Sequence, residues 1–370
     1  METLQRADFV TVDTEFKRTN TYWPILCLIQ IAGPNNEYII DPLADGISLR
    51  SFYDLMANTD VLKVFHASRQ DLEIFYHEND ALPHPVFDTQ IAAMVCGFGD
   101  SVGYETLVNQ LANGQVDKSS RFTDWSRRPL SKKQLHYAIG DVTHLRVIYE
   151  KLAAMLEENG RRDWLAEEMD DLEDPATYYT HPEDAWQRLK TRSNNRRFLG
   201  YVRAIAEWRE EIAQTRDMPR NRVMRDDMIM ELAAHPPRDV EEMKKIRNLP
   251  PQATKSGGTR PLIDRIHEVR KLDDDALPKP QQKKKLPKGI GPTVDLLKVL
   301  LKQKCEAEGV AQKLVANVAD LELLAADDNA DIHAMRGWRR EVFGEDALAL
   351  KSGRLALSVQ NNQIVVSRLR

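Results

Sequence analysis

The chain has 370 residues and a formal net charge of −5, with 42% hydrophobic and 29% charged residues, a composition typical of a globular protein of two or three domains. No apolar run approaches the ~20 residues of a membrane span, and METLQRADFV lacks the apolar stretch of a secretory signal, so we expect a cytoplasmic protein. Cys27, Cys96 and Cys305 lie far apart with no CxxC pair, which indicates a reducing compartment and argues against structural zinc.

The first ~95 residues alternate strand and helix signals. Strands are expected at FVTVDTEF, ILCLIQIA, EYIIDP, VLKVFHA and VFDT, and helices over residues 47–57 and 68–79. Three strands and a helix followed by β-α-β indicate a mixed sheet with helices on its faces. Residues 103–111 and 131–159 are then expected to be helical, the second helix ending near Gly160.

The strand signal nearly disappears after residue 183. Apolar residues have helical spacing over 184–216, and further helices are expected over 224–234, 239–246 and 261–271. Residues 272–292, with PKPQQKKKLPKGIGP, are typical of an extended linker. Residues 293–350 are again helical, and the last segment predicts a hairpin around Asn361-Asn362.

The two halves of the chain differ in charge. Residues 1–180 have 16 Lys+Arg and 29 Asp+Glu, a net charge of −13, whereas residues 181–370 have a net charge of +8. A basic half can hold a polyanion on which an acidic half acts, although both halves could also be ordinary solvated surfaces.

Acidic residues occur in apolar surroundings at three places. Asp13 and Glu15 are two residues apart on a probable strand, so both side chains leave the same face. Asp71 lies in the first turns of a helix after a strand, where the helix dipole alone could also explain an acid. Asp141 is on the long helix. Acids gathered at one point suit Mg²⁺ or Mn²⁺, and with water as nucleophile they suit phosphodiester hydrolysis.

A tyrosine accompanies the last of these acids. Tyr137 and Asp141 are four residues apart on a helix and share a face, so the phenol can orient water beside the carboxylate. His136, five residues before Asp141, is a rival candidate for the base, and we expect it to lie on the surface beside the site.

In this order, the acids and the tyrosine resemble the three exonuclease motifs of the DEDD superfamily in its tyrosine subclass. The segments TEFKRTNTYWPILCLIQIA, VFHASRQDLEIF, FDTQIAA and DWSRRPLSKKQLHYAIGDV resemble the bacterial ribonuclease D family, and RRFLGYVRAIAEWREEIAQTRDMPRNRVMRDDMIMELA resembles its helicase-and-RNase-D C-terminal (HRDC) domain. The resemblance implies a ribonuclease-H-like α/β domain with a mixed five-stranded sheet over residues 1–165, followed by two all-α domains. These are a first HRDC domain over 183–271 and, after the linker 272–292, a second, diverged one over 293–370.

The resemblance also implies a function. The protein is expected to be a 3′→5′ exoribonuclease that trims structured RNAs, chiefly tRNA precursors, and releases nucleoside 5′-monophosphates. Two divalent ions, Mg²⁺ or Mn²⁺, are expected on Asp13, Glu15, Asp71 and Asp141, with Tyr137 as the fifth catalytic residue. No obligatory protein partner is inferred. The alternatives are a single-strand DNA exonuclease, since 2′-hydroxyl contacts are not readable from sequence, and a non-catalytic RNA-binding adaptor.

Five further residues are candidates for RNA contacts. Aromatic rings can stack on terminal bases and arginines can bind phosphate. The candidates are Phe16, Tyr22, Trp23, Arg127 and Arg128. We also expect the first 180 residues alone to cleave short oligomers.

Overall fold

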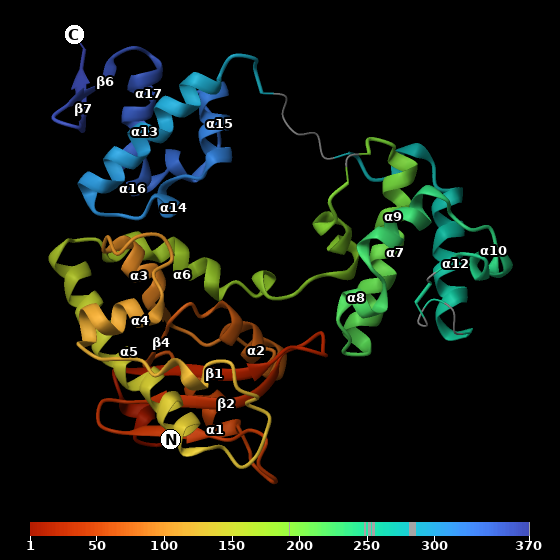
Figure 1. Cartoon of the computed structure of the whole chain (residues 1–370), viewed down its shortest axis with the longest axis horizontal. Helices are drawn as coiled ribbons and strands as arrows, with labels where there is room; N and C mark the ends of the chain where they lie inside the picture. Colours follow the sequence, from red (N-terminus) through yellow and green to blue (C-terminus); the bar gives the residue numbers. More distant parts are fainter. Residues whose placement is uncertain (192, 248, 251–252, 254–255, 281–285, 370) are drawn as a thin grey trace.

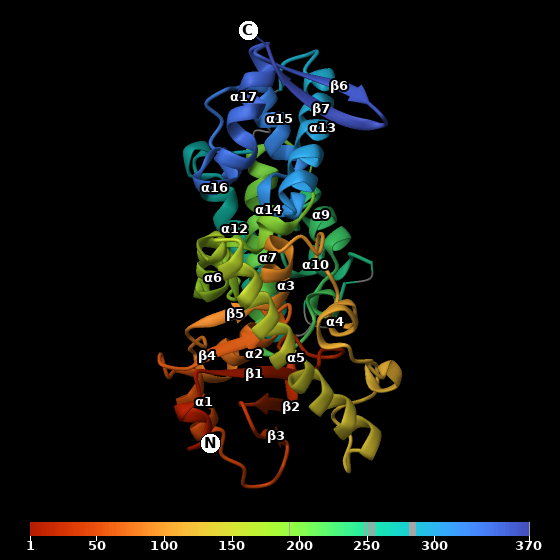
Figure 2. The same cartoon turned by 90° about the vertical axis from the view of Figure 1, so that its left-hand side faces the viewer.

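The computed structural model describes residues 1–191, 193–247, 249–250, 253, 256–280 and 286–369. Figures 1 and 2 show three parts: an N-terminal sheet domain, a first helical module (residues 196–277) to one side of it, and a second helical module (residues 291–368) on top of it.

The sheet domain contains the five strands and the helices that the sequence predicts. Its elements are η1 (Leu4–Arg6), β1 (Phe9–Lys17), β2 (Ile25–Ala32), β3 (Glu37–Ile40), α1 (Arg50–Met56), β4 (Leu62–Phe65), α2 (Arg69–Asn79), β5 (Val86–Asp88), α3 (Thr89–Val95), α4 (Tyr104–Leu107), the π-helical turn η2 (Val108–Ala112), η3 (Lys118–Ser120), α5 (Lys132–Glu158), η4 (Arg162–Leu165) and α6 (Ala166–Glu173). The predicted mixed sheet has the order β3-β2-β1-β4-β5. Strand β1 is antiparallel to β2 and parallel to β4, so it lies at the centre.

Local sequence features define the two ends of helix α5, and a hydrogen bond ties its middle to the sheet. Ser131 forms a capping box with Gln134 at the N-terminus, an arrangement that satisfies two free backbone donors. The Thr11 hydroxyl of β1 donates to the Val142 carbonyl at 2.8 Å. The helix ends at Glu158, and Gly160 has a φ of +62°, which favours glycine. The predicted span of 131–159 is therefore confirmed to within one residue.

The first helical module follows a 3₁₀ segment. The preceding segment contains η5 (Pro175–Thr177) and η6 (Pro182–Arg188). The module itself contains α7 (Arg196–Thr215), α8 (Arg220–Val223), α9 (Asp226–Ala234), α10 (Val240–Lys244), α12 (Ser256–Lys271) and η7 (Asp274–Ala276). The helical spacing over 184–216 was misleading, because the chain is 3₁₀ up to Arg188 and the helix starts only after Asn195, whose side chain accepts from the Phe198 amide. Helix α12 begins five residues before the expected Pro261. Residues 281–285 of the expected linker lie outside the described residues.

The second helical module is α13 (Gly291–Glu308), α14 (Gln312–Val315), α15 (Val318–Ala326), η8 (His333–Met335), α16 (Gly337–Arg339), the π-helical turn η9 (Arg340–Gly344) and α17 (Glu345–Lys351), with a final hairpin of β6 (Leu355–Gln360) and β7 (Gln363–Arg368). The hairpin turns at Asn361 and Asn362, both with positive φ, as the sequence predicted.

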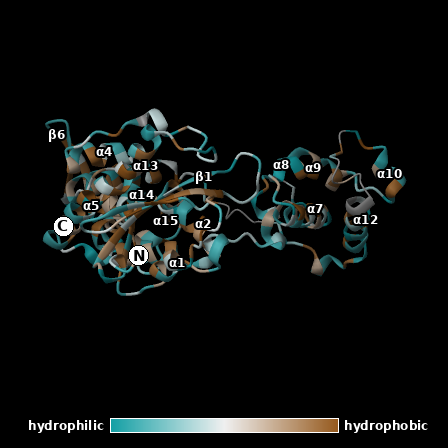
Figure 3. Ribbon diagram, turned by 90° about the horizontal axis from the view of Figure 1, so that it is seen from below, coloured by the Kyte–Doolittle hydropathy of each residue, from teal (hydrophilic) through white to brown (hydrophobic). Residues whose placement is uncertain are grey.

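The two helical modules differ in how much of their hydrophobic core they share with the sheet domain. Buried residues of α3 and α5 form one continuous cluster with Leu297, Leu301 and Phe343 of the second module. The first module has its own core, which includes only Tyr22 from the buried residues of the sheet domain. Figure 3 shows the first module standing apart, with β1 running toward it. Among the described residues, no helix has both the length and the apolar character to cross a bilayer.

Candidate active site

Three carboxylates meet where β1 passes under α5. Asp13 and Glu15 leave the same face of β1, and Asp141 is buried on the facing side of α5. One carboxylate oxygen from each residue lies within 4.8 Å of the other two. The strand periodicity and the helix register therefore bring together residues that are more than 120 positions apart in the chain.

Asp71 lies beside this group and not within it. It is buried in the first turn of α2, and the Thr14 hydroxyl donates to its carboxylate. The side chain of Thr14 points to the opposite face of β1 from those of Asp13 and Glu15. Asp71, which Thr14 holds, is therefore beside the other three carboxylates and not among them. Its charge still acts on both of those residues and raises their pKa values.

The carboxylates destabilise one another's charged forms. Burial, followed by the charges of Asp141 and Asp71, raises the pKa of Glu15 to about 9, and burial raises the pKa values of Asp71 and Asp141 to about 7. The pKa of Asp13 lies well above its usual range, first because of burial and then because of Asp141. Such shifts mark sites where negative charge is concentrated without compensation.

This donor set fits a hard divalent cation. All its ligand atoms are carboxylate oxygens, the kind that Mg²⁺ and Mn²⁺ prefer. Among the side chains that the structure describes, no Lys or Arg forms an ion pair with Asp13, Glu15 or Asp141. The charge of Arg121 lowers the pKa of Glu15 and, after the larger effect of Tyr137, that of Asp141, but burial outweighs both effects. A bound cation would supply the missing positive charge.

Tyr137 and His136 have different surroundings. The Tyr137 hydroxyl acts on the Asp141 carboxylate and partly offsets the rise in its pKa caused by burial, and the Tyr137 ring lies 6.0 Å from that of Trp125. Burial, and then the charge of Asp141, raise the pKa of Tyr137 above its ordinary value, so the phenol stays protonated. His136 is exposed on the surface of α5, as the sequence analysis expected.

Two of the expected RNA-contacting residues form hydrogen bonds within the protein. Tyr22 is only 5% exposed, and its hydroxyl is hydrogen-bonded to Glu210 at 2.5 Å and to Arg220 at 2.7 Å in the first helical module. The Arg128 guanidinium donates to both oxygens of Asp41 and to the Cys27 carbonyl. RNA contacts by Tyr22 and Arg128 stay predictions, and in the folded protein both side chains are already held by these partners.

The other three candidates remain accessible to different degrees. Trp23 is half-buried and stacks on His77, with ring centroids 4.1 Å apart. Phe16 is half-buried against the core of the sheet domain. Arg127 is exposed and lies 3.4 Å from Asp124.

Sequence reasoning missed several neighbours of the acids. The Tyr104 hydroxyl donates to the Asp141 main-chain carbonyl at 2.5 Å and so fixes α5 beside α4. Arg121 acts electrostatically on the acids, and the adjacent Phe122 is 91% exposed, with its ring 5.3 Å from the Arg121 guanidinium. The adjacent Arg and Phe in a polar loop could have indicated Arg121 and Phe122 from the sequence. Nothing in the sequence indicated the role of Tyr104.

Comparison with known proteins defines the class. A family model described as 3′–5′ exonuclease matches residues 1–157, and an HRDC domain model matches residues 198–260. The fold and the carboxylate cluster are thus those of a 3′→5′ exonuclease, a class that depends on divalent metal ions.

The relatives define the family more narrowly. The chain is 49% identical to a ribonuclease D of Nitrobacter hamburgensis, over 96% of this chain and 93% of the relative, and 48% identical to one of Granulibacter bethesdensis, over 98% and 92%. The crystal structure of Escherichia coli RNase D matches with a TM-score of 0.79 at 28% identity, covering 95% of each chain. The chain belongs to the ribonuclease D family, and it is a hydrolase of the 3′→5′ exoribonuclease type.

Proposed function

We propose that this exoribonuclease trims the single-stranded 3′ ends of structured RNAs, chiefly tRNA precursors, and releases nucleoside 5′-monophosphates. The observation that carries the proposal is the group formed by Asp13, Glu15 and Asp141, with Asp71 beside it. The E. coli relative is described as an exoribonuclease involved in structured RNA processing, which supports the substrate class. Because tRNA precursors are processed in the bacterial cytoplasm, we propose that location too.

The four carboxylates would hold two divalent ions, Mg²⁺ or Mn²⁺. When bound, such ions supply Lewis-acid stabilisation of the charge that develops on phosphate and leaving oxygen. Asp13, Glu15 and Asp141 offer oxygens on one side, and Asp71, with its position fixed by Thr14, offers them from α2. No obligatory protein partner is needed for this chemistry.

Tyr137 would orient the attacking water. With its hydroxyl beside the Asp141 carboxylate, the protonated phenol can donate one hydrogen bond and accept another from a water beside the acids. Its raised pKa argues for a positioning role and against proton abstraction.

Replacing this hydroxyl tests the assignment. Tyr137→Phe keeps the ring against Trp125 but removes the oriented contact, so kcat should fall on the order of 10²-fold. The melting temperature should change little, as measured by thermal unfolding. His136→Ala is the matched control, because His136 is exposed and adjacent in sequence, and it should keep near-normal turnover. The reverse ranking would assign the chain to the histidine subclass.

The raised pKa values of Asp71 and Asp141 predict that the stability of the metal-free protein depends on pH. Since the folded pKa values of Asp71 and Asp141 are about 7 and the ordinary Asp value is 3.8, the metal-free folded state binds more protons than the unfolded state between these values. The free energy of unfolding should therefore fall as pH rises from about 4 through about 7. Metal binding must displace these protons, so the rise in melting temperature with added Mn²⁺ should be larger at pH 8 than at pH 5.5. If added Mn²⁺ raised the melting temperature by the same amount at both pH values, metal binding would not be coupled to loss of these protons, and the prediction would be wrong.

We propose that the domains divide the work. Residues 1–165 would carry out hydrolysis, and the helical regions 183–271 and 293–370, joined by 272–292, would hold the body of the RNA. The positive charge lies in 183–271, with 20 Lys+Arg and 14 Asp+Glu, and in the linker, with 5 and 3, whereas 293–370 has 11 of each. The charges of −13 and +8 for the two halves support this division.

The substrate proposal can be tested directly. A 5′-labelled tRNA precursor with a short 3′ trailer, the matching single-stranded RNA and the matching DNA should be incubated with and without Mg²⁺. We expect metal-dependent shortening of the trailer one nucleotide at a time, a stop near the mature 3′ end, and slower attack on DNA. Preferential loss of the DNA would favour the DNA-exonuclease alternative, and no shortening of any substrate would favour the adaptor.

A further inference from the structure

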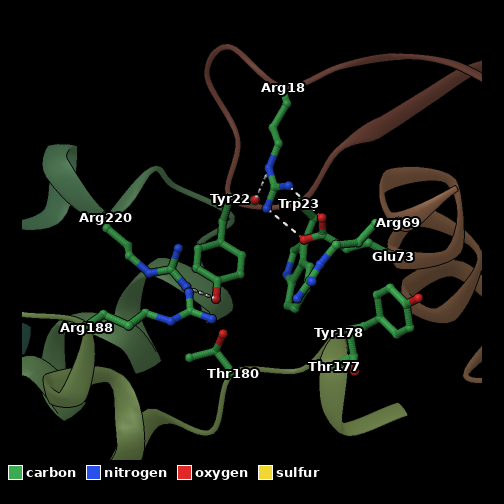
Figure 4. Close-up of a pocket in the computed structure, with 10 residues that line it drawn as sticks. All are labelled: Arg18, Tyr22, Trp23, Arg69, Glu73, Thr177, Tyr178, Thr180, Arg188 and Arg220. Carbon is green, nitrogen blue, oxygen red and sulfur yellow. Dashed lines mark hydrogen bonds and ion pairs between the residues drawn. The ribbon is translucent and has the colours of Figure 1, made fainter. Parts of the chain in front are cut away.

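A polar cavity of about 220 Å³ lies where the sheet domain meets the first helical module (Figure 4). Its walls come from the β1–β2 loop, the start of α2, the segment 177–180, η6 and α8. Four arginines, Arg18, Arg69, Arg188 and Arg220, line it together with a single carboxylate, that of Glu73. Even with Glu210, which pairs with Arg220 behind the wall, positive groups outnumber negative groups four to two.

Two of the guanidinium groups are held in place. Arg18 forms two hydrogen bonds of 2.8 Å with Glu73. Arg220 donates to Glu210 at 2.6 and 2.5 Å and lies over the Tyr22 ring at 4.6 Å. Side chains fixed in this way lose little conformational entropy when a ligand binds.

The other two guanidinium groups lack a carboxylate partner. Among the described residues, the side chains of Arg69 and Arg188 form neither an ion pair nor a hydrogen bond, in contrast to Arg18 and Arg220. Figure 4 shows Arg188 extending alongside Arg220 toward the cavity. Guanidinium groups that converge without counter-charges repel one another, and an anion between them removes that repulsion.

We propose that this cavity binds a backbone phosphodiester of the RNA, a few nucleotides upstream of the scissile bond. The proposal deepens the proposed function and depends on its single-stranded RNA substrate. The planar guanidinium fork matches the geometry of phosphate oxygens, and several forks around one point are a common arrangement for that group.

The cavity is connected to the acids by shared elements. Arg18 follows Glu15 by three residues at the end of β1, which corresponds to roughly 10 Å of extended chain. Arg69 precedes Asp71 by two residues on α2. Two of the four arginines are thus close in sequence to the acids, Arg18 just after the end of β1 and Arg69 on α2, which sets a short spacing that suits successive phosphates of one strand.

An aromatic side chain and a second hollow extend the surface. Trp23 lines the cavity as a half-buried ring, and aromatic faces hold single-stranded bases without sequence preference. A neighbouring hollow of about 380 Å³ shares Arg18, Tyr22 and Arg220 and continues over Asn221. The two hollows thus form one continuous surface for RNA along the boundary between the two parts of the protein.

The test combines neutral linkages in the RNA with neutral side chains in the full-length protein. A series of single-stranded RNAs, each with one uncharged methylphosphonate at a different distance from the 3′ end, is bound to wild type and to Arg69→Gln/Arg188→Gln with metal chelated. For wild type, the affinity should fall about tenfold when the methylphosphonate is at one particular upstream position. For the variant, a methylphosphonate at that position should cause no additional loss of affinity. Its salt dependence should be shallower by about 0.7 in log K against log[salt] for the lost phosphate contact.

The control is Arg50→Gln/Arg162→Gln, which removes the same charge from two exposed side chains outside the cavity and should match wild type at every position. Additive losses at all positions, or an unchanged salt slope, would overturn the proposal. So would weaker inhibition of the variant by inorganic phosphate or nucleoside 5′-monophosphate with unchanged RNA binding, because the cavity would then hold free product. Binding is measured without metal and therefore without cleavage. A failure of the proposed phosphate site thus appears in the binding data, whereas a failure of the proposed function appears only in the separate cleavage assay.

Discussion

Asp13→Asn and Asp141→Asn are each expected to lower turnover of single-stranded RNA by roughly 10³-fold or more at saturating Mg²⁺, while RNA binding stays largely intact. The reason is that a lost carboxylate misplaces a cation whose stabilising charge acts mainly in the transition state. Single-turnover cleavage and binding with metal chelated measure the two effects separately. Asp71→Asn should behave in the same way, because an amide oxygen can still accept from Thr14 and so preserve the fold.

A second readout separates loss of metal from loss of folding. Asp71→Asn and Asp141→Asn each remove a carboxylate with a pKa of about 7, which is charged at pH 8. These metal-free variants should therefore melt higher than metal-free wild type at pH 8, and added metal should raise their melting temperatures less. Glu158→Gln, an exposed acid on the same helix as Asp141, is the control and should change neither property. Near-normal turnover in any of the three variants would remove that residue from the site.

Arg339→Ala is expected to destabilise the protein by about 3 kcal/mol. Arg339 is 1% exposed in the second helical module, and its guanidinium group donates to the Leu314 carbonyl at 2.7 Å and to Glu167 and Glu168 of α6. Both glutamates retain contact with water, so we take the lower end of the range for breaking a buried pair. Chemical denaturation, followed by tryptophan fluorescence, would measure the loss.

The matched control is the next residue. The side chain of Arg340 is half exposed and lies 3.8 Å from Glu345, so Arg340→Ala should cost less than about 1 kcal/mol. The sheet domain and second module share one core, and Trp164 of the former stacks on Trp338 of the latter at 4.1 Å. They should therefore unfold in one transition. Two separate transitions, or an unaffected Arg339→Ala variant, would show that the module is only loosely attached.

This shared core changes the expectation for a shortened chain. The sequence suggested that residues 1–180 could act alone on short oligomers. In the structure, such a chain would expose the apolar residues of α3 and α5 that Leu297, Leu301 and Phe343 cover. We now expect the shortened protein to aggregate, because a large uncovered apolar surface associates with itself.

Local chemistry explains what could be predicted from the sequence alone. Alternating and continuous apolar runs predicted the strands, the Ser131 and Gln134 pattern is consistent with the start of α5, and Asn361-Asn362 predicted the terminal turn. These features depend on neighbours within a few residues. The spacing of Asp13 with Glu15 and of Tyr137 with Asp141 likewise determined which side chains share a face, and the resemblance carried by those motifs indicated the family.

Only the tertiary structure decided which partners those faces meet. Periodicity shows that a helix has an apolar side, but it does not say whether α13 covers another helix of its module or the sheet domain, because any apolar surface of suitable shape can bury it. For the same reason Tyr22 and Arg128 looked available to RNA, although Glu210 and Asp41, distant in sequence, already hold them. The arginine cavity also needed the structure, since its four guanidinium groups come from segments 200 residues apart.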